Sequence, residues 1–228
     1  NIAELVNGGK TDINITLDKN IDLTGKDWTP IGTSFDNSYK GTFDGGGHTI
    51  TGLTFTTNDQ FVGLFGYLNR AGTVKNVVME GIQITSNHMF GCTGGVVGYS
   101  WGTIENCSVS GSVSGTVYVG GVVGAQIGGS ITGCSSSATV KGTVDVGGVA
   151  GQTNSSATMT ACYATGNVII EMDPKKNIAG GGLVGMNAGS SLLACYATGN
   201  VTSTGSSTGY MHIGGFLGNN YTTVTACY

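Results

Sequence analysis

Gly121-Val122-Val123-Gly124 and the following Ile131-Thr132-Gly133-Cys134 are the two motifs that decide the fold of this chain. A glycine, two apolar residues and a second glycine recur along the sequence, and a short alternation of apolar and mostly polar residues follows each copy. Self-similarity at a regular interval indicates a tandem repeat. The six copies of the first motif begin at Gly63, Gly95, Gly121, Gly148, Gly182 and Gly215.

The length of the repeat predicts the architecture. The closing glycines, at 66, 98, 124, 151, 185 and 218, are 26 to 34 residues apart. That length holds about three short strands, which cannot bury their apolar sides alone and must stack around a shared core. We therefore predict an all-β fold, a parallel β-helix or β-solenoid, right-handed, with neighbouring coils about 4.8 Å apart. A β-propeller is the alternative, but its blades are longer, at about 40 to 45 residues.

Composition agrees with a repeat whose glycines are structural. The 228 residues include 42 glycines and only 2 prolines, while regularly spaced apolar residues argue against a disordered linker. We expect residues 1–55 to form a leader that caps the solenoid and residues 56–228 to form the coils of one continuous domain. The last repeat breaks off at Cys227-Tyr228. Either more sequence follows, or another molecule covers the open strand edge by end-to-end self-association.

Charge and hydropathy exclude several classes of partner. The net charge of −4 is spread along the chain, and Arg70 is the single arginine, so a surface that follows nucleic-acid phosphates is not expected. No apolar run is long enough for a membrane span. Gly45-Gly46-Gly47 lacks the Gly-Lys-Ser/Thr sequence of a phosphate-binding loop. We predict no cofactor.

Several repeat cores resemble the GLUG repeat of bacterial surface proteins. The resemblance rests on Gly63-Leu64-Phe65-Gly66, Gly182-Leu183-Val184-Gly185 and the strand Cys195-Tyr196-Ala197-Thr198-Gly199-Asn200-Val201. The segment from Ile21 to Ile50 looks like the leader that precedes such repeats. The resemblance implies an extracellular bacterial protein, on the cell surface or secreted, that is adhesin-like or belongs to the non-peptidase region of immunoglobulin A1-specific metallopeptidases. The zinc-binding His-Glu-x-x-His motif of such a peptidase is absent from the sequence.

A polysaccharide-active enzyme is the main alternative function, because many β-helix proteins cleave polysaccharides. Hydrolysis of a glycosidic bond needs two carboxylates at a defined separation. The acidic residues do not converge in the sequence: Asp18, Asp22, Asp27, Asp36 and Asp44 lie in the leader, and the coils carry isolated ones. We therefore predict no catalytic residues and a non-catalytic module that acts as an adhesive or spacer element.

Five of the six cysteines occupy one position of the repeat. Apolar residues three positions earlier place these cysteines beside the core, so we predict a ladder of small buried thiols. Side chains that point the same way in stacked coils fit a disulfide poorly, and one thiol per coil does not make a zinc site. Cys92 lies outside the ladder and is expected to behave differently. The ladder consists of Cys107, Cys134, Cys162, Cys195 and Cys227.

The unequal repeat lengths point to a variable corner. The extra residues fall at 86–93, 171–179 and 203–212, always between the second motif and the next closing glycine. Insertions at a constant repeat position lie on one edge of a solenoid, where a host glycan or protein could bind. His48, near Asp44, is interpreted as a turn residue rather than an acid-base pair. The candidate ligand-binding residues are His88, Met89, Phe90, Lys175, Lys176, Tyr210 and His212.

Overall fold

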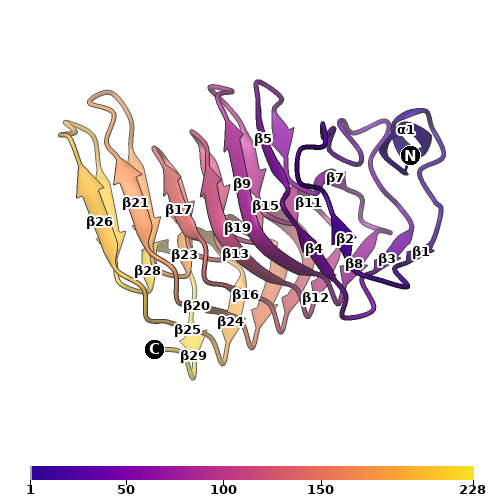
Figure 1. Cartoon of the computed structure of the whole chain (residues 1–228). Coiled ribbons are helices and arrows are strands. Elements are labelled where there is room, and N and C mark those ends of the chain that lie inside the picture. The colour runs from indigo at the N-terminus through magenta and orange to yellow at the C-terminus, as the bar shows by residue number, and fades with distance from the viewer. Residues whose placement is uncertain (1) are drawn as a thin grey trace.

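The computed structural model describes residues 2–228 and has the solenoid architecture that the repeat predicts. Short strands coil around one axis from the N-terminal helix to the C-terminal end (Figure 1). The strands of residues 2–228 form three sheets, and every pairing between the named strands is parallel. The predicted fold class, an all-β parallel β-solenoid, is confirmed.

Each coil visits the three sheets, here called C, A and B, in that order. Sheet C contains β6 (Phe61–Val62), β10 (Cys92–Gly94), β14 (Tyr118–Gly120), β18 (Asp145–Gly147), β22 (Ile178–Gly181) and β27 (Met211–Gly214). Sheet A contains β1 (Ile15–Thr16), β3 (Thr42–Asp44), β7 (Phe65–Leu68), β8 (Thr73–Lys75), β11 (Val97–Ser100), β12 (Thr103–Glu105), β15 (Val123–Thr132), β19 (Ala150–Thr160), β23 (Val184–Ala188), β24 (Ser191–Leu193), β28 (Leu217–Asn220) and β29 (Val224–Thr225). Sheet B contains β2 (Ile21–Asp22), β4 (Thr49–Thr51), β5 (Thr54–Thr57), β9 (Val78–Ser86), β13 (Ser108–Ser114), β16 (Ser135–Ser136), β17 (Thr139–Gly142), β20 (Tyr163–Ala164), β21 (Val168–Glu171), β25 (Tyr196–Ala197) and β26 (Val201–Thr204).

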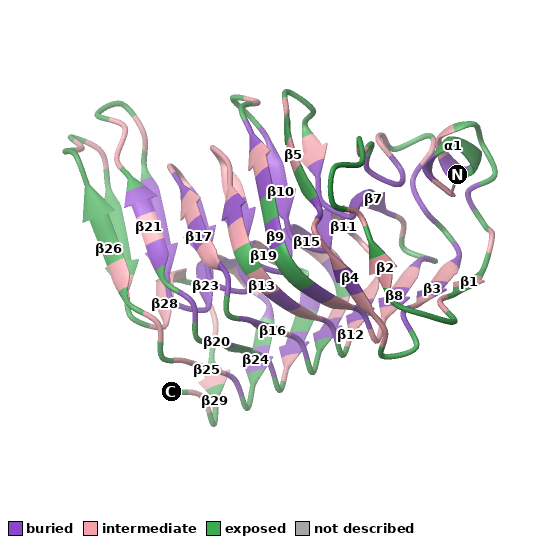
Figure 2. Cartoon of the chain, viewed as in Figure 1, coloured by how far each residue is buried: buried purple, intermediate pink, exposed green. Residues whose placement is uncertain are grey.

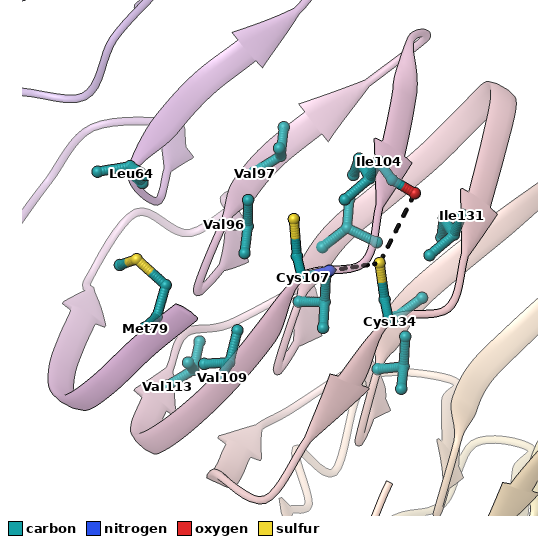
Figure 3. Packing of buried hydrophobic residues seen from close by; sticks show 14 of the residues in the cluster. Leu64, Met79, Val96, Val97, Ile104, Cys107, Val109, Val113, Ile131 and Cys134 are labelled. Atoms are coloured by element: carbon teal, nitrogen blue, oxygen red, sulfur yellow. Dashed lines mark hydrogen bonds between the residues drawn. The ribbon is translucent and has the colours of Figure 1, made fainter. Parts of the chain in front are cut away.

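The core consists of apolar side chains stacked in register from coil to coil. Ile104 pairs with Val74 in the coil before it and with Ile131 in the coil after it, and Met159 and Leu192 continue the ladder. Each of these five side chains is at most 1% exposed. Figure 3 shows Ile104 and Ile131 beside the thiols of Cys107 and Cys134. Stacking identical repeat positions thus buries the apolar face that a single coil would leave in water.

The leader residues form the first coils of the same solenoid. Ile15 pairs with Phe43, and Ile21 pairs with Ile50, so strands of the leader are in register with later coils. Helix α1 (Ile2–Asn7) places Ala3 and Val6 against the core at this end. Helix α1 therefore covers the N-terminal end of the core with apolar residues.

A left-handed backbone position forms the corner between sheets A and B. It lies just before the cysteine of the second motif and has a φ of 53° at Ala161 and 54° at Ala194. Asparagine and glycine tolerate this conformation, but it brings the Cβ of alanine close to a carbonyl oxygen. The equivalent residues are Asn76, Asn106, Gly133, Ala161, Ala194 and Ala226.

Ala161→Gly is expected to stabilise the protein by about 0.5 to 1 kcal/mol. Relief of the left-handed strain is worth about 1 to 2 kcal/mol, and the greater freedom of glycine in the unfolded chain offsets part of it. Urea unfolding followed by circular dichroism measures the change. Ala197→Gly is the matched control, because Ala197 is not among the positive-φ residues. This variant should be less stable than the wild type. A loss of stability in both variants would contradict this account.

The last coil of the described chain is the most exposed part of the solenoid. Strand β26 is mostly exposed, whereas β21 beside it is mostly buried or intermediate (Figure 2). Strands β26 and β27 each pair with one neighbour among residues 2–228. Tyr228, which follows Cys227, is 78% exposed.

Candidate functional site

The Gly-x-x-Gly turns fold sheet A tightly against sheet C. A Cβ at Gly124 would lie 2.6 Å from the backbone nitrogen of Thr93, and a Cβ at Gly98 would overlap the backbone nitrogen of Val62. Only glycine permits such an approach between two backbones. The closing glycine of the repeat is therefore required by this close packing.

Two rows of side chains run along the solenoid axis on either side of this contact, and the two cavities between them are together called the groove here. The row on sheet C consists of Phe61, Cys92, Tyr118, Asp145, Ala179 and His212, which are paired in register. The row on sheet A consists of Tyr67, Tyr99, Ala125, Gln152, Met186 and Asn219. A cavity of about 370 Å³ lies between the rows near Phe61, and a second of about 330 Å³ lies near Asp145. Both volumes fall in the range of small-molecule sites.

The half of the groove nearer the N-terminus is aromatic. The ring centroids of Tyr67 and Tyr99 lie 4.9 Å apart, and Phe61 packs against both at 5.4 and 5.2 Å. Phe35 meets Tyr67 edge-on at 6.0 Å. Burial raises the pKa of Tyr67, Tyr99 and Tyr118, so these phenols stay neutral and keep a hydrogen-bond donor. This half is a cluster of uncharged aromatic rings.

The other half of the groove is lined by both apolar and polar side chains and contains one acidic side chain. Asp145 is 6% exposed, and desolvation raises its pKa to about 7. Among residues 2–228 its carboxyl group has neither an ion pair nor a hydrogen bond within the protein. His212, Tyr210 and Tyr221 line the same cavity. A carboxyl group with this pKa exchanges a proton near neutral pH.

Three of the predicted ligand-binding residues lie on the groove. Phe90 lines the aromatic cavity, while Tyr210 and His212 line the cavity near Asp145. The Nδ1 atom of His88 accepts a hydrogen bond from the backbone N–H of Phe90 at 3.2 Å, which holds this loop in shape. Met89, at the tip of the loop, is 63% exposed.

The two lysines lie in the loop between β21 and β22. Lys176 Nζ is 3.9 Å from the carboxylate of Asp173, and the backbone N–H of Lys175 donates to the same carboxylate at 2.9 Å. Neither lysine lines the two cavities of the groove. Coils with short corners, after β13 and β17, separate this loop from the one that carries Phe90. The two loops are therefore three coil spacings apart, about 14 Å, and the predicted ligand-binding residues do not form one surface.

The cysteine ladder runs through the core, away from the groove. Cys107, Cys134, Cys162 and Cys195 are at most 1% exposed, whereas Cys227 in the last coil is only partly buried. All six cysteines are free thiols. The Sγ of Cys134 accepts a hydrogen bond from the backbone N–H of Cys107 at 3.5 Å and lies 3.6 Å from the carbonyl oxygen of Ile104 (Figure 3). The thiols of the ladder thus pack against the backbone of the preceding coil and help to hold neighbouring coils together.

Cys92 differs from the ladder because its side chain belongs to the groove. It pairs with Phe61 and Tyr118 and lines the aromatic cavity, although it is only 3% exposed. Burial raises its pKa to about 12. A thiol with this pKa stays protonated at neutral pH, so Cys92 is a poor nucleophile.

His48 and Asp44 take part in a turn of the leader. The backbone N–H of His48 donates to the carbonyl of Gly45 at 2.8 Å, and Asp44 accepts hydrogen bonds from Gly46 N–H and from the Asn76 side chain, both at 2.9 Å. These bonds lower the pKa of Asp44, with Lys75 Nζ at 3.4 Å adding to the effect. Residues 2–228 contain no group of three or more His, Cys, Asp or Glu side chains arranged to hold a metal ion.

Sequence reasoning missed the residues on the two faces of the groove. Tyr67 and Tyr99 directly follow a closing glycine, and Tyr118 and Asp145 stand three residues before the first glycine of their motif. Their constant distance from the repeat glycines marks them as equivalent positions in the sequence. This distance does not predict a binding site unless the glycine turn is known to bring sheets A and C together.

The GLUG motif family matches residues 91–114 and 115–141. Residues 91–141 consist of two GLUG repeats. Residues 91–114 contain β10, β11, β12 and β13, so one GLUG motif corresponds to one complete coil, from sheet C through sheet A to sheet B. The second match covers the next coil, and the register of the strands continues beyond both.

Two curated proteins are similar to part of this GLUG solenoid. Halomucin of Haloquadratum walsbyi is 38% identical over 119 residues, which are 48% of this chain. A "Putative Gly-rich membrane protein" of Evansella cellulosilytica is 34% identical over 96 residues, or 42% of this chain. The aligned part is 1% of the first relative and 11% of the second.

A solved structure has the same fold over the whole of this chain. A chain described as a "putative immunoglobulin A1 protease" from Bacteroides ovatus superposes with a TM-score of 0.78 and 22% identity. The match covers 100% of this chain and 72% of that chain. At this identity the likeness concerns the fold alone. Within residues 2–228, no helix is both long enough and apolar enough to cross a membrane.

Proposed function

We propose that this GLUG solenoid is a non-catalytic module of a bacterial protein on the cell surface or secreted, where it acts as a rigid spacer with an adhesive groove. The observation that carries the proposal is the groove itself, in which two in-register rows of side chains flank a tight contact between backbones. Tyr99 on β11 and Tyr118 on β14 stand on strands paired with a neighbour on each side, so these side chains lose little entropy when a ligand binds. One relative is described as a "Putative Gly-rich membrane protein", which supports a place at the cell surface.

The distribution of carboxylates supports a binding role over hydrolysis. The aromatic cavity is lined by no acidic side chain, and the cavity near Asp145 is lined by that carboxyl group alone. Cleavage of a glycosidic bond by the usual mechanisms needs two carboxylates across the bond. Glu80, which lines a shallow hollow on sheet B, lies on another face of the solenoid.

Binding and turnover on the same ligands test the proposal. The chain and its Tyr99→Ala variant are incubated with arrays of polysaccharides and of host extracellular proteins, and bound protein and released products are both measured. We expect the wild type to bind at least one ligand that the Tyr99→Ala variant does not bind. We also expect the wild type to release no product from that ligand. The absence of any retained ligand would contradict the adhesive role. Product release that Asp145→Asn abolishes would contradict the non-catalytic role.

A further inference from the structure

We propose that the aromatic half of the groove binds a neutral polysaccharide chain, with sugar rings stacked on the side chains of successive coils. This inference rests on the proposed adhesive function and names the chemical class of its ligand. The binding surface consists of Phe61, Phe90, Tyr99 and Tyr118, supported from behind by Tyr67.

The rings of Phe61 and Tyr99 form a platform that spans two successive coils. Tyr67 is only 6% exposed and packs edge-on against Phe61, with an interplanar angle of 90°. Phe61 and Tyr99, at 5.2 Å, come from successive coils and are half-buried, which leaves part of each ring facing the cavity. The coil spacing of about 4.8 Å is close to the length of one pyranose unit, so successive sugars can meet successive rings. Aromatic side chains offer an apolar face for the C–H groups of a sugar and a phenol for its hydroxyls.

Phe90, from the insertion at residues 86–93, lines one side of the aromatic cavity. It is 63% exposed and lines the same cavity as Tyr99 and Tyr118. The hydrogen bond from its backbone N–H to His88 and the bond from the Thr116 hydroxyl to the His88 carbonyl tie this loop to the next coil. These bonds hold the backbone of the loop at Phe90 beside the cavity.

The charges around the platform favour a neutral ligand. The aromatic cavity has no charged side chain in its lining, and Gln60 supplies an amide that can bond to sugar hydroxyls. Arg70, in the adjoining cavity, lies 5.3 Å above the ring of Trp101 and is engaged with it. Acidic polymers are bound by clusters of arginine and lysine, which this half of the groove lacks.

A peptide ligand is disfavoured by the pairing of the strands. Strand β10 pairs with both β6 and β14, and β11 pairs with both β7 and β15. The backbone groups of β10 and β11 already bond to their neighbours, so a peptide cannot pair with these two strands as an extra strand. Recognition has to use the faces of the side chains, and flat aromatic faces suit sugar rings.

Isothermal titration calorimetry with soluble polysaccharides tests the inference on the full chain. Neutral β-glucan, mannan and xylan are compared with the acidic polymer polygalacturonate, using the wild type, Tyr99→Ala, Phe90→Ala and Tyr163→Ala. We expect a neutral polysaccharide to bind, with Tyr99→Ala lowering the affinity by about tenfold or more. Tyr163, which stacks on Tyr196 at 4.9 Å on sheet B, is a tyrosine outside the groove, and its variant should bind as the wild type does.

The outcomes separate this inference from the adhesive role. If Tyr99→Ala fails to fold by circular dichroism, Phe90→Ala decides, because Phe90 is an exposed loop residue whose loss should still weaken binding. Binding of polygalacturonate alone would overturn the inference. So would binding of a host protein that depends on Tyr99 while no neutral polysaccharide binds, and the adhesive role would then stand. Absence of any ligand that depends on the groove would overturn both.

Discussion

Gly148→Ala is expected to lower the free energy of unfolding by about 3 kcal/mol, since overpacking a well-packed core is among the costlier single changes. A Cβ at Gly148 would overlap the carbonyl oxygen of Gly182 in the next coil and lie 2.5 Å from the Cβ of Ala164. The oxygen belongs to a backbone held by its own strand pairings and cannot move aside. The added methyl group must therefore separate two coils and weaken the hydrogen bonds between them.

Gly215→Ala is the matched control for this substitution. Gly215 occupies the same repeat position, but a Cβ there would have no heavy atom within 4 Å. We expect its stability to change by less than about 0.5 kcal/mol. Urea unfolding of both variants, with hydrogen exchange to locate the opening coils, measures the difference. Equal destabilisation of the two variants would contradict the view that the repeat glycine is required by contact between coils.

Asp145→Asn is expected to remove most of the pH dependence of stability between about pH 4 and 7. Desolvation raises the pKa of Asp145 from 3.8 to about 7 in the folded protein. Between these values the folded state holds a proton that the unfolded chain has released, so the free energy of unfolding falls as the pH rises. The contribution is fully present at low pH and is lost as the pH rises through 7. Its full size is up to about 4 kcal/mol.

The asparagine variant keeps the shape of the side chain without its charge. It should therefore match the wild type near pH 4 and be clearly more stable near pH 8. Urea unfolding across this range measures the effect. His212→Gln is the control for the imidazole in the same cavity, and Tyr118→Phe is the control for the phenol beside Asp145. A wild type whose stability rises from pH 5 to 8 would contradict the assignment.

The sequence by itself determined the solenoid and its period. Gly121-Val122-Val123-Gly124 and its copies predicted stacked coils, and the structure places Ile104, Ile131 and Met159 in one buried ladder. The sequence predicts the fold because each repeat position contacts the same position in the next coil. The spacing of the repeats in the sequence therefore predicts which residues are in contact. The cysteines of the second motif were placed beside the core by the same reasoning.

Only the tertiary structure decided where a ligand-binding groove lies. Tyr99 and Phe61 are far apart in the sequence, and their rings meet because the glycine turn presses sheet A onto sheet C. Of the candidates chosen from the variable corner, Phe90 lines one cavity and Tyr210 and His212 line the other. The remaining four lie outside both: His88, Met89, Lys175 and Lys176. Loop insertions are visible in a single sequence, but the angle between two sheets depends on backbone contacts between coils. The Gly-x-x-Gly pattern thus predicts the coils from the sequence. The groove forms because these glycines allow sheets A and C to pack closely.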